Sequence, residues 1–463
     1  MDHTLVFNAD LIRRYDQTGP RYTSYPTAAQ FSEDFGDSDY REWVRHSNED
    51  PIPHPLSLYI HIPFCDTVCF YCACNKIVTK DHSRAITYLE HLKRELTCQG
   101  EMFDRDRIVE QLHWGGGTPT FLSHQEMRDL MASTRENFTL RDDDKGEYSI
   151  EVDPRRVDES TIPLLRELGF NRLSLGVQDF DPVVQKAVNR IQGEEETLMV
   201  MDTARRESFR SINVDLIYGL PHQTASSFIG TIDKIIHAAP DRIAVYNYAH
   251  LPERFPPQRR IREEDLPSPS EKLIILQQTI ERLAGAGYLY IGMDHFARPD
   301  DELAIAQRNG TLHRNFQGYS SHAECDMVGI GVTSIGRVAD NFSQNAKDLE
   351  TYYQRIEENG LAIERGLESE PDDLLRREII TSLMCHFLLD INQLEKKWHF
   401  SFRNHFADEV ENLRRLQEDG LLVLSPNSLR ILPAGRLLVR NICMVFDHYL
   451  PKDKTQQGFS RVI

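Results

Sequence analysis

Short apolar segments alternate with longer amphipathic ones through the middle of this 463-residue chain, and few folds satisfy such a pattern. Six short segments predict strands, with a weaker seventh: residues 56–62, 109–114, 148–152, 171–177, 211–217, 242–248 and 288–296. The segments between them have a helical period: residues 85–96, 125–136, 162–168, 194–206, 225–238 and 270–284. This alternation predicts an α/β fold in which helical crossovers join parallel strands.

The sheet can close as a full eight-stranded β/α barrel, stay open as a partial barrel, or wind doubly as a flat sheet. Several predicted strands end in polar or glycine-rich loops: residues 63–74, 115–120, 151–154, 178–180 and 215–220. In barrels and open α/β sheets, active sites lie at the carboxyl ends of the strands. We therefore expect the chemistry of the chain to gather at these loops.

The pattern changes after about residue 365, where helices and a short hairpin follow. The helical segments and the two arms of the hairpin are residues 372–385, 391–397, 402–419, 421–424, 429–432 and 434–445. This order predicts a mainly helical, winged-helix-like module that serves as packing or a lid. The expected domains are an N-terminal arm over the active site (1–55), a barrel domain (56–365) and a C-terminal helical domain (366–463).

The formal net charge of −19 argues against nucleic acid as a partner, because its binders carry a basic patch and this chain has no dense Lys/Arg run. No stretch of about 18 apolar residues occurs, so we expect no membrane span. The first twenty residues lack the apolar core of a secretory signal. We expect a cytoplasmic protein with reduced thiols.

Four of the eight cysteines fall within ten residues: Cys65, Cys69, Cys72 and Cys74. The C-x3-C-x2-C spacing of the first three places three thiolates around one 4Fe–4S cube, which leaves one iron open to a cofactor. The alternatives are a structural zinc site, for which Cys72 and Cys74 are poorly spaced, and buried unligated thiols. Cys74 is either a fourth ligand or, as we prefer, a thiol that lines the pocket.

A C-x3-C-x2-C loop after a strand is the signature of the radical S-adenosylmethionine (SAM) superfamily. The longer stretch from Tyr59 to Cys65, with a further C-x-C, resembles the oxygen-independent coproporphyrinogen III oxidase (dehydrogenase) family of haem biosynthesis. The resemblance continues through ordered blocks along nearly the whole chain: residues 113–120, 149–154, 176–180, 215–221, 248–252, 293–297, 314–319 and 459–463.

The resemblance implies a partial (β/α)6 barrel with further strands and a helical C-terminal domain. It implies one 4Fe–4S cluster per chain and two SAM molecules. The implied activity is an anaerobic oxidoreductase that decarboxylates two propionates of coproporphyrinogen III to vinyl groups through a 5′-deoxyadenosyl radical, giving protoporphyrinogen IX. We also expect a low-potential electron donor, as yet unidentified, and a monomer.

The resemblance also assigns residues. Positions around the first SAM are matched by Tyr59, Gly115, Gly116, Gly117, Glu151 and Ile335. Positions around the second are matched by Tyr71, Thr118, Gln178, Arg190, Asp215 and Ala249. The catalytic candidates are Cys74 and Glu151. Tyr71 departs from the family, which commonly has Phe there, and this leaves its contact with the second SAM in doubt.

Four propionates on the substrate require basic groups, and the candidates by motif are Arg21, Arg298 and Arg314, with Tyr22 and Ser24 as hydrogen-bonding groups. The main alternative is a haem-binding chaperone of the same radical SAM family. That branch tends to lack the extra C-x-C cysteine and the long N-terminal arm, and both are present here. A third hypothesis is a transcription regulator with a redox-sensing cluster, which the charge disfavours.

Overall fold

The computed structural model describes residues 4–450, so the last block of the resemblance (459–463) lies outside the described residues. The chain divides into two compact units. One, which we call the sheet unit, comprises residues 31–275 and 324–368. The other, the helical unit, comprises the chain up to residue 30, residues 276–323 and the chain from 369 onward. The three-domain division at residues 55 and 365 stays a prediction.

Six parallel strands form the centre of the sheet unit, and each lies within a few residues of its predicted range. They are β1 (Leu56–Ile62), β4 (Ile108–Gly116), β6 (Glu147–Val152), β7 (Arg172–Gln178), β8 (Ser211–Tyr218) and β9 (Arg242–Asn247). All residues of β1 are buried except Tyr59, which is half-buried. Both faces of β1 are therefore buried, as is usual for a strand in a parallel sheet.

Four further strands extend this sheet beyond β1. β14 (Asp326–Ile330) runs parallel to β1, and β15 (Ile335–Val338), β16 (Asn341–Asn345) and β17 (Ile363–Leu367) continue in antiparallel order. Within the sheet unit the order is β9-β8-β7-β6-β4-β1-β14-β15-β16-β17, with β5 (Thr139–Leu140) beside β4. The described strands form no closed barrel, and the prediction of six β/α units with further strands is confirmed.

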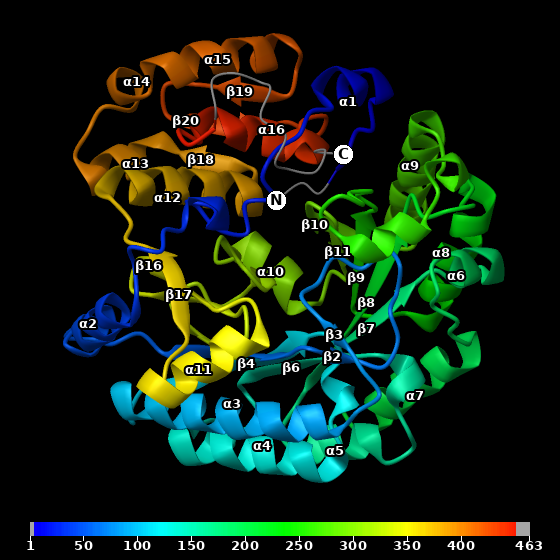
Figure 1. The fold of residues 1–463 in the computed structure, drawn as a ribbon. Helices are drawn as coiled ribbons and strands as arrows, with labels where there is room; N and C mark the ends of the chain where they lie inside the picture. The colour runs from blue at the N-terminus through cyan, green and yellow to red at the C-terminus, as the bar shows by residue number, and fades with distance from the viewer. Residues whose placement is uncertain (1–3, 451–463) are drawn as a thin grey trace. The chain divides into compact units, whose positions relative to one another are not determined.

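Helices connect the strands of the sheet unit, and α3, α4, α5 and α7 follow one another along one side of it in Figure 1. The helices are α2 (Asp37–Asn48), α3 (Ser83–Met102), α4 (His124–Asn137), α5 (Thr161–Glu167), α6 (Pro182–Ala187), α7 (Glu194–Arg206), α8 (Ala225–Ala238) and α11 (Leu349–Asn359). α9 (Pro269–Gly285) belongs partly to each unit. Short 3-10 helices are η2 (Pro119–Phe121), η3 (Pro154–Arg156), η4 (Pro256–Arg260) and η5 (Glu263–Asp265).

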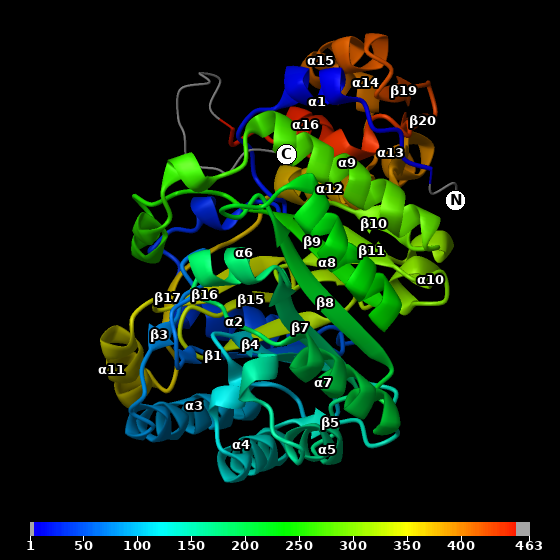
Figure 2. The same ribbon diagram turned by 90° about the vertical axis from the view of Figure 1, so that its right-hand side faces the viewer.

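Local sequence sets several helix starts. The Ser123 side chain accepts from the Glu126 N–H while Glu126 bonds back to Ser123, a capping box that begins α4. Asp181 caps α6, whose first residue is Pro182. Figure 2 shows β7 and β8 side by side, and the two strands are parallel, so their carboxyl ends lie at the same edge of the sheet.

The helical unit contains short strands among helices. Its elements are α1 (Ala9–Tyr15), η1 (Ala28–Gln30), β10 (Leu289–Gly292), β11 (His295–Ala297), α10 (Glu302–Asn309), β12 (His313–Asn315), β13 (Gly318–Ser320), α12 (Pro371–His386), β18 (Leu388–Asp390), α13 (Ile391–Trp398), α14 (Phe402–His405), α15 (Ala407–Glu418), β19 (Leu422–Leu424), β20 (Ser428–Ile431), η6 (Arg436–Leu438), α16 (Val439–Cys443) and η7 (Met444–Phe446). The predicted order of helices and hairpin is confirmed, and β18 completes a three-stranded sheet, β18-β20-β19.

Two details differ from the sequence-based expectation. The weak seventh strand is a hairpin, because Gly292 and Met293 both have positive φ and reverse the chain between β10 and β11. The helix expected over 402–419 is interrupted at Phe406, whose φ of −105° and ψ of 40° are not helical and whose side chain is buried. None of the helices in the described range combines the length and the apolar run that a bilayer crossing requires.

Candidate functional site

The cysteine loop follows β1 and is fixed to neighbouring backbone. β2 (Phe64–Cys65) pairs in parallel with β3 (Ile77–Val78), so the two ends of the loop lie side by side. Midway along, the Phe70 N–H donates to the Val188 carbonyl at 2.9 Å. The loop is therefore a built part of the fold rather than a free surface segment.

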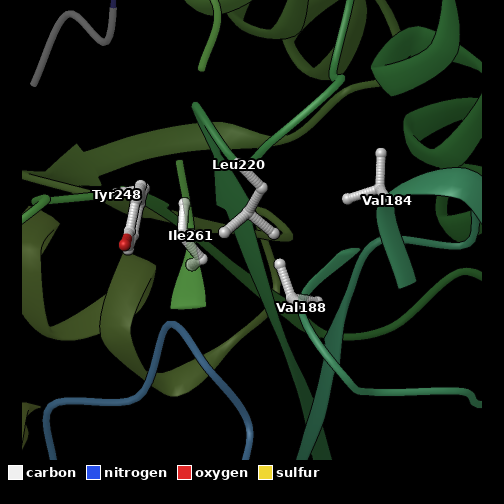
Figure 3. Close-up of a cluster of buried hydrophobic side chains, with 5 residues drawn as sticks. All are labelled: Val184, Val188, Leu220, Tyr248 and Ile261. Atoms are coloured by element: carbon white, nitrogen blue, oxygen red, sulfur yellow. The ribbon is translucent and has the colours of Figure 1, made fainter. Parts of the chain in front are cut away.

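A small apolar cluster supports the middle of this loop. Figure 3 shows its buried members: Val184, Val188, Leu220, Tyr248 and Ile261. Phe70 and Tyr71 pack against the cluster, and Gln258 Nε2 donates to the Tyr71 carbonyl at 3.0 Å. Because Leu220 follows β8 and Tyr248 follows β9, the cluster places Tyr71 at the carboxyl ends of these strands. Tyr248 is followed in sequence by Ala249.

Cations surround the thiols of the loop. Arg190 Nη1 lies 3.7 Å and Arg155 Nη2 3.9 Å from Cys69 Sγ, and Lys76 Nζ donates to the Cys72 carbonyl at 3.0 Å. Burial, and then the neighbouring Cys72 and Cys69, raise the pKa of the Cys65 thiol to about 11. Three thiols close enough to influence one another, compensated by guanidinium groups, form a donor set that suits an iron–sulfur cluster.

Cys74 differs from the other three cysteines of the loop in its exposure to solvent. Its side chain is exposed, and its hydrogen bond with Cys72 lowers the pKa of the Cys72 thiol to about 5 and raises that of Cys74 well above its ordinary value. Cys72 is therefore the thiolate of this pair and Cys74 the thiol. Whether Cys74 serves as a pocket thiol or a ligand stays a prediction.

Three glycines, Gly115–Gly117, mark the end of β4. A Cβ on any of them would meet a neighbour at less than 3 Å: Glu151 Oε1 at 2.9 Å from Gly115, His61 Cε1 at 2.6 Å from Gly116, and the Phe64 carbonyl oxygen at 2.7 Å from Gly117. Gly116 also has a φ of +118°, which side chains rarely adopt. Neighbours within the chain itself therefore already require glycine at Gly116 and Gly117.

Glu151 lies near the end of β6 in a chain of aromatic and polar contacts. His113 Nε2 is 3.4 Å from Glu151 Oε1, and the Gly116 N–H donates to Oε2 at 3.2 Å. The His113 ring stacks on Tyr59 with centroids 5.7 Å apart, and the Tyr59 hydroxyl is 3.0 Å from His61 Nδ1. Burial alone would raise the pKa of Glu151, but His113 and the Gly116 N–H lower it, which favours a carboxylate at this position.

Asp215 presents a second carboxyl group at the same edge. Asn213 Nδ2 donates to its Oδ1 at 2.9 Å and Ser174 Oγ to its Oδ2 at 3.1 Å. Burial, and to a lesser degree the charge of Glu151, raises the pKa of Asp215 to about 6. The effect of Glu151 on the pKa of Asp215 indicates that the fold brings these two predicted residues within electrostatic reach of each other.

Arg190 and Gln178 lie together at the end of β7. Arg190 Nη2 donates to the Gly176 carbonyl at 2.5 Å and Nη1 to Asp153 Oδ2 at 3.4 Å, while its buried Nε–H has no partner among the described residues. Gln178 has a φ of 69° at a β-bulge, and a Cβ on Gly176 would lie 3.0 Å from Gln178 Nε2. An unsatisfied buried donor beside a carboxamide is suited to a polar ligand.

The remaining predicted residues also lie in the sheet unit. Thr118 is buried, with Oγ1 3.5 Å from Cys65 Sγ. Ile335 is the first residue of β15 and lies close to Gly329, since a Cβ added to Gly329 would be 2.8 Å from the Ile335 carbonyl oxygen. Gly329 is in turn the register partner of Tyr59. Ala249 is half-buried after Tyr248. The predicted cofactor-binding residues thus gather at the carboxyl edge of the parallel strands.

Sequence reasoning missed several contributors to this edge. Arg155 and Asp153, paired at 2.6 Å, follow β6 and brace Arg190 and Cys69, yet no spacing rule relates them to the cysteines. Asn213 was detectable, because it is two residues before Asp215 and so on the same face of β8.

The helical unit holds the predicted substrate-binding arginines. Arg21 pairs with Asp294 at 2.7 Å, whereas Arg298 is exposed near Asp300 at 3.5 Å. Arg314 is buried. Tyr22 donates to Asp447 at 3.0 Å, and the Ser24 hydroxyl donates to a neighbouring carbonyl of its own segment at 2.8 Å.

Comparison with known proteins places this geometry in context. Residues 59–235 match the Radical SAM superfamily, and residues 370–438 match the HemN C-terminal domain. The chain is 55% identical over 460 residues to the oxygen-independent coproporphyrinogen III oxidase of Pseudomonas aeruginosa, covering 99% of each. It is 50% identical over 453 residues to the protein of the same name from Escherichia coli strain K12, covering 98% of each. The solved structure of coproporphyrinogen III oxidase (HemN) from E. coli, described as a radical SAM enzyme, is similar with a TM-score of 0.92 at 48% identity, over 96% of this chain and 100% of that one.

Proposed function

The chain belongs to the oxygen-independent coproporphyrinogen III oxidase family, and from that relationship we propose that it converts two propionates of coproporphyrinogen III to vinyl groups. Each conversion releases carbon dioxide without oxygen, and the product is protoporphyrinogen IX, an intermediate of haem biosynthesis. The observation that carries the proposal is the 55% sequence identity to the Pseudomonas aeruginosa protein over 99% of the chain, a range that includes the three-cysteine loop at the carboxyl end of β1.

Membership of the radical SAM superfamily implies a 4Fe–4S cluster and SAM. Cys65, Cys69 and Cys72 would hold the cluster, and Arg155 and Arg190 would offset its negative charge through their contacts with Cys69. When bound, the two cofactors supply the one-electron chemistry that removes a hydrogen atom from the substrate. The residues of the chain hold the cofactors, orient the substrate and exclude water.

The first SAM, in this proposal, would be held at the edge formed by Gly115, Gly116, Gly117, Tyr59, Glu151 and Ile335. An ionised Glu151 accepts hydrogen bonds from an amine or a ribose hydroxyl, and the lowered pKa supports that state. Tyr59 and His113, stacked at 11° between their ring planes, hold one wall of this edge in place.

A second SAM, also proposed, would be held near the ends of β7, β8 and β9 by Thr118, Gln178, Asp215, Ala249, Tyr71 and Arg190. The unpartnered Nε–H of Arg190 supports this placement, because a guanidinium fork that is already anchored through Nη1 and Nη2 can still donate to a carboxylate. Asp215 offers acceptor oxygens to ribose hydroxyls. The added hydroxyl of Tyr71 leaves the packing of its ring on the apolar cluster intact.

Two catalytic roles complete the proposal. Cys74, a thiol next to a ligand thiolate, lines the pocket and acts on the substrate or its radical rather than on the iron. Glu151 positions the reacting SAM. An external low-potential one-electron donor would supply the electron that the cluster needs, and we propose that the enzyme works as a cytoplasmic monomer.

Anaerobic turnover tests the proposal directly. Reconstituted protein is incubated with SAM, a reductant and coproporphyrinogen III, and vinyl products are measured by chromatography and mass spectrometry. Loss of two carboxyl groups per substrate supports the proposal. Stoichiometric haem binding without any vinyl product would instead identify the haem-binding chaperone.

A further inference from the structure

Arg314 is a buried cation without an anion. It lies on β12 with 8% of its surface exposed, and its Nε and Nη1 are buried without hydrogen-bond partners. No carboxylate among the described residues pairs with it. Its guanidinium lies 4.7 Å from the centre of the Tyr319 ring, its register partner on β13, a contact that does not satisfy the N–H groups. An unpaired buried charge is strongly unfavourable unless something completes it.

Two more guanidinium groups, those of Arg21 and Arg440, belong to the same unit as Arg314. Arg21 already engages Asp294 at 2.7 Å, and Arg440 Nε donates to the Pro20 carbonyl at 2.9 Å. Burial, and then the charges of Arg21 and Arg314, lower the pKa of Arg440 to about 10, while Asp294 opposes the shift. Arg440 therefore lies within electrostatic reach of two other cations, Arg21 and Arg314, and of the carboxylate of Asp294.

Packing alone does not explain this arrangement, because Arg376, which is equally buried in the helical unit, has carboxylate partners. Arg376 pairs with Asp372 at 2.6 Å and with Glu409 at 2.9 Å. Arg314 has the same burial without such partners, so its environment is complete only when an anion is present.

We propose that Arg314 is the centre of a carboxylate-binding site, to which Arg21 and Arg440 add positive potential, and that it binds one propionate of the tetrapyrrole substrate. The identity of the ligand rests on the proposed function, since the tetrapyrrole carries four propionates. The fork of a guanidinium group matches the two oxygens of a carboxylate, which gives both charge and orientation.

Fluorescence titration with coproporphyrin III, the stable oxidised form of the substrate, tests the site on the anaerobically reconstituted full chain. Arg314→Gln is expected to weaken binding at least about tenfold. Arg314→Lys keeps the charge and should recover part of the loss. The matched control is Arg308→Gln on α10, an exposed arginine that bonds only a backbone carbonyl at 2.8 Å, and it should bind as the wild type does.

The tetramethyl ester of coproporphyrin III separates carboxylate recognition from a structural role. The wild type should prefer the acid over the ester, and Arg314→Gln should lose that preference without melting earlier than the wild type. Equal loss of affinity for acid and ester together with a lower melting temperature would overturn the proposal, as would unchanged acid binding by Arg314→Gln. If the wild type shows the Arg314-dependent preference but yields no vinyl product, the carboxylate site stands and the proposed activity fails.

Discussion

Replacement of Gly116 by Ala tests whether the glycine-rich end of β4 is required by the protein itself. At a φ of +118° an alanine is strained by about 1–3 kcal/mol. Its Cβ would lie 2.6 Å from His61 Cε1, and overpacking of this kind costs about a further 1–3 kcal/mol. The His61 ring cannot turn away freely, because the Tyr59 hydroxyl and the Asn75 carbonyl lie 3.0 and 3.3 Å from its nitrogens. We expect the free energy of unfolding to fall by about 4 kcal/mol.

Urea unfolding, followed by the fluorescence of the nearby buried Trp114, measures this change. The matched control is Gly230→Ala within α8, where an added Cβ meets nothing within 4 Å and φ is not positive. That change should stabilise the protein by about 0.5–1 kcal/mol, since alanine is the better helix former. SAM binding should be lost in Gly116→Ala alone. If both variants unfold like the wild type, the glycine serves neither the turn nor the His61 contact.

Three further changes have expected outcomes. Alanine at any one of the proposed cluster ligands, Cys65, Cys69 or Cys72, should remove the iron, which metal analysis should measure at about four atoms per wild-type chain. Cys74→Ala should keep the iron but lose the vinyl product. Because the folded-state pKa of Asp215 is raised from 3.8 to about 6, its contribution to stability is complete below pH 3.8 and lost as the pH rises through 6. Ligand-free Asp215→Asn should therefore be more stable than the wild type at pH 8, by up to about 3 kcal/mol, but not at pH 4, in thermal melts at the two pH values. In the wild type Arg107 Nη2 lies 2.6 Å from Asp326 Oδ2, and both side chains are buried. Arg107→Met should lower the free energy of unfolding by about 3–5 kcal/mol, because it leaves the Asp326 carboxylate buried without this cation. The double variant Arg107→Met with Asp326→Leu should recover most of that loss in urea unfolding.

The parallel core could be predicted from the sequence because its strands are short apolar segments that alternate with amphipathic helical segments. β1 coincides with its predicted range, and α7 and α8 do as well. The hairpin of β10 and β11 was missed because its apolar residues continue across the turn, and only the positive φ of Gly292 and Met293 reverses the chain. Apolar periodicity does not contain that information.

The site divides in the same way. The cysteines were found because their spacing is local, and Asp215 because it lies within a block that resembles a known family. Arg155 was missed, since its contact with Cys69 joins residues 86 positions apart. Arg440 was missed too, because it gains its meaning only from the nearby Arg21 and Arg314.

The charge of the chain shows why composition says little about ligands. A net charge of −19 argues against nucleic acid, yet Arg190 beside the cysteine loop and Arg314 in the helical unit are both buried with an N–H that has no partner in the described part of the chain. Acidic residues on the surface offset neither group, because solvent screens exposed charges while buried ones interact strongly. Thiolates and carboxylates are the anions that these two arginines can meet. An acidic protein can thus keep local positive sites for an anionic cluster and a propionate-bearing substrate, and their chemistry follows from burial rather than from net charge.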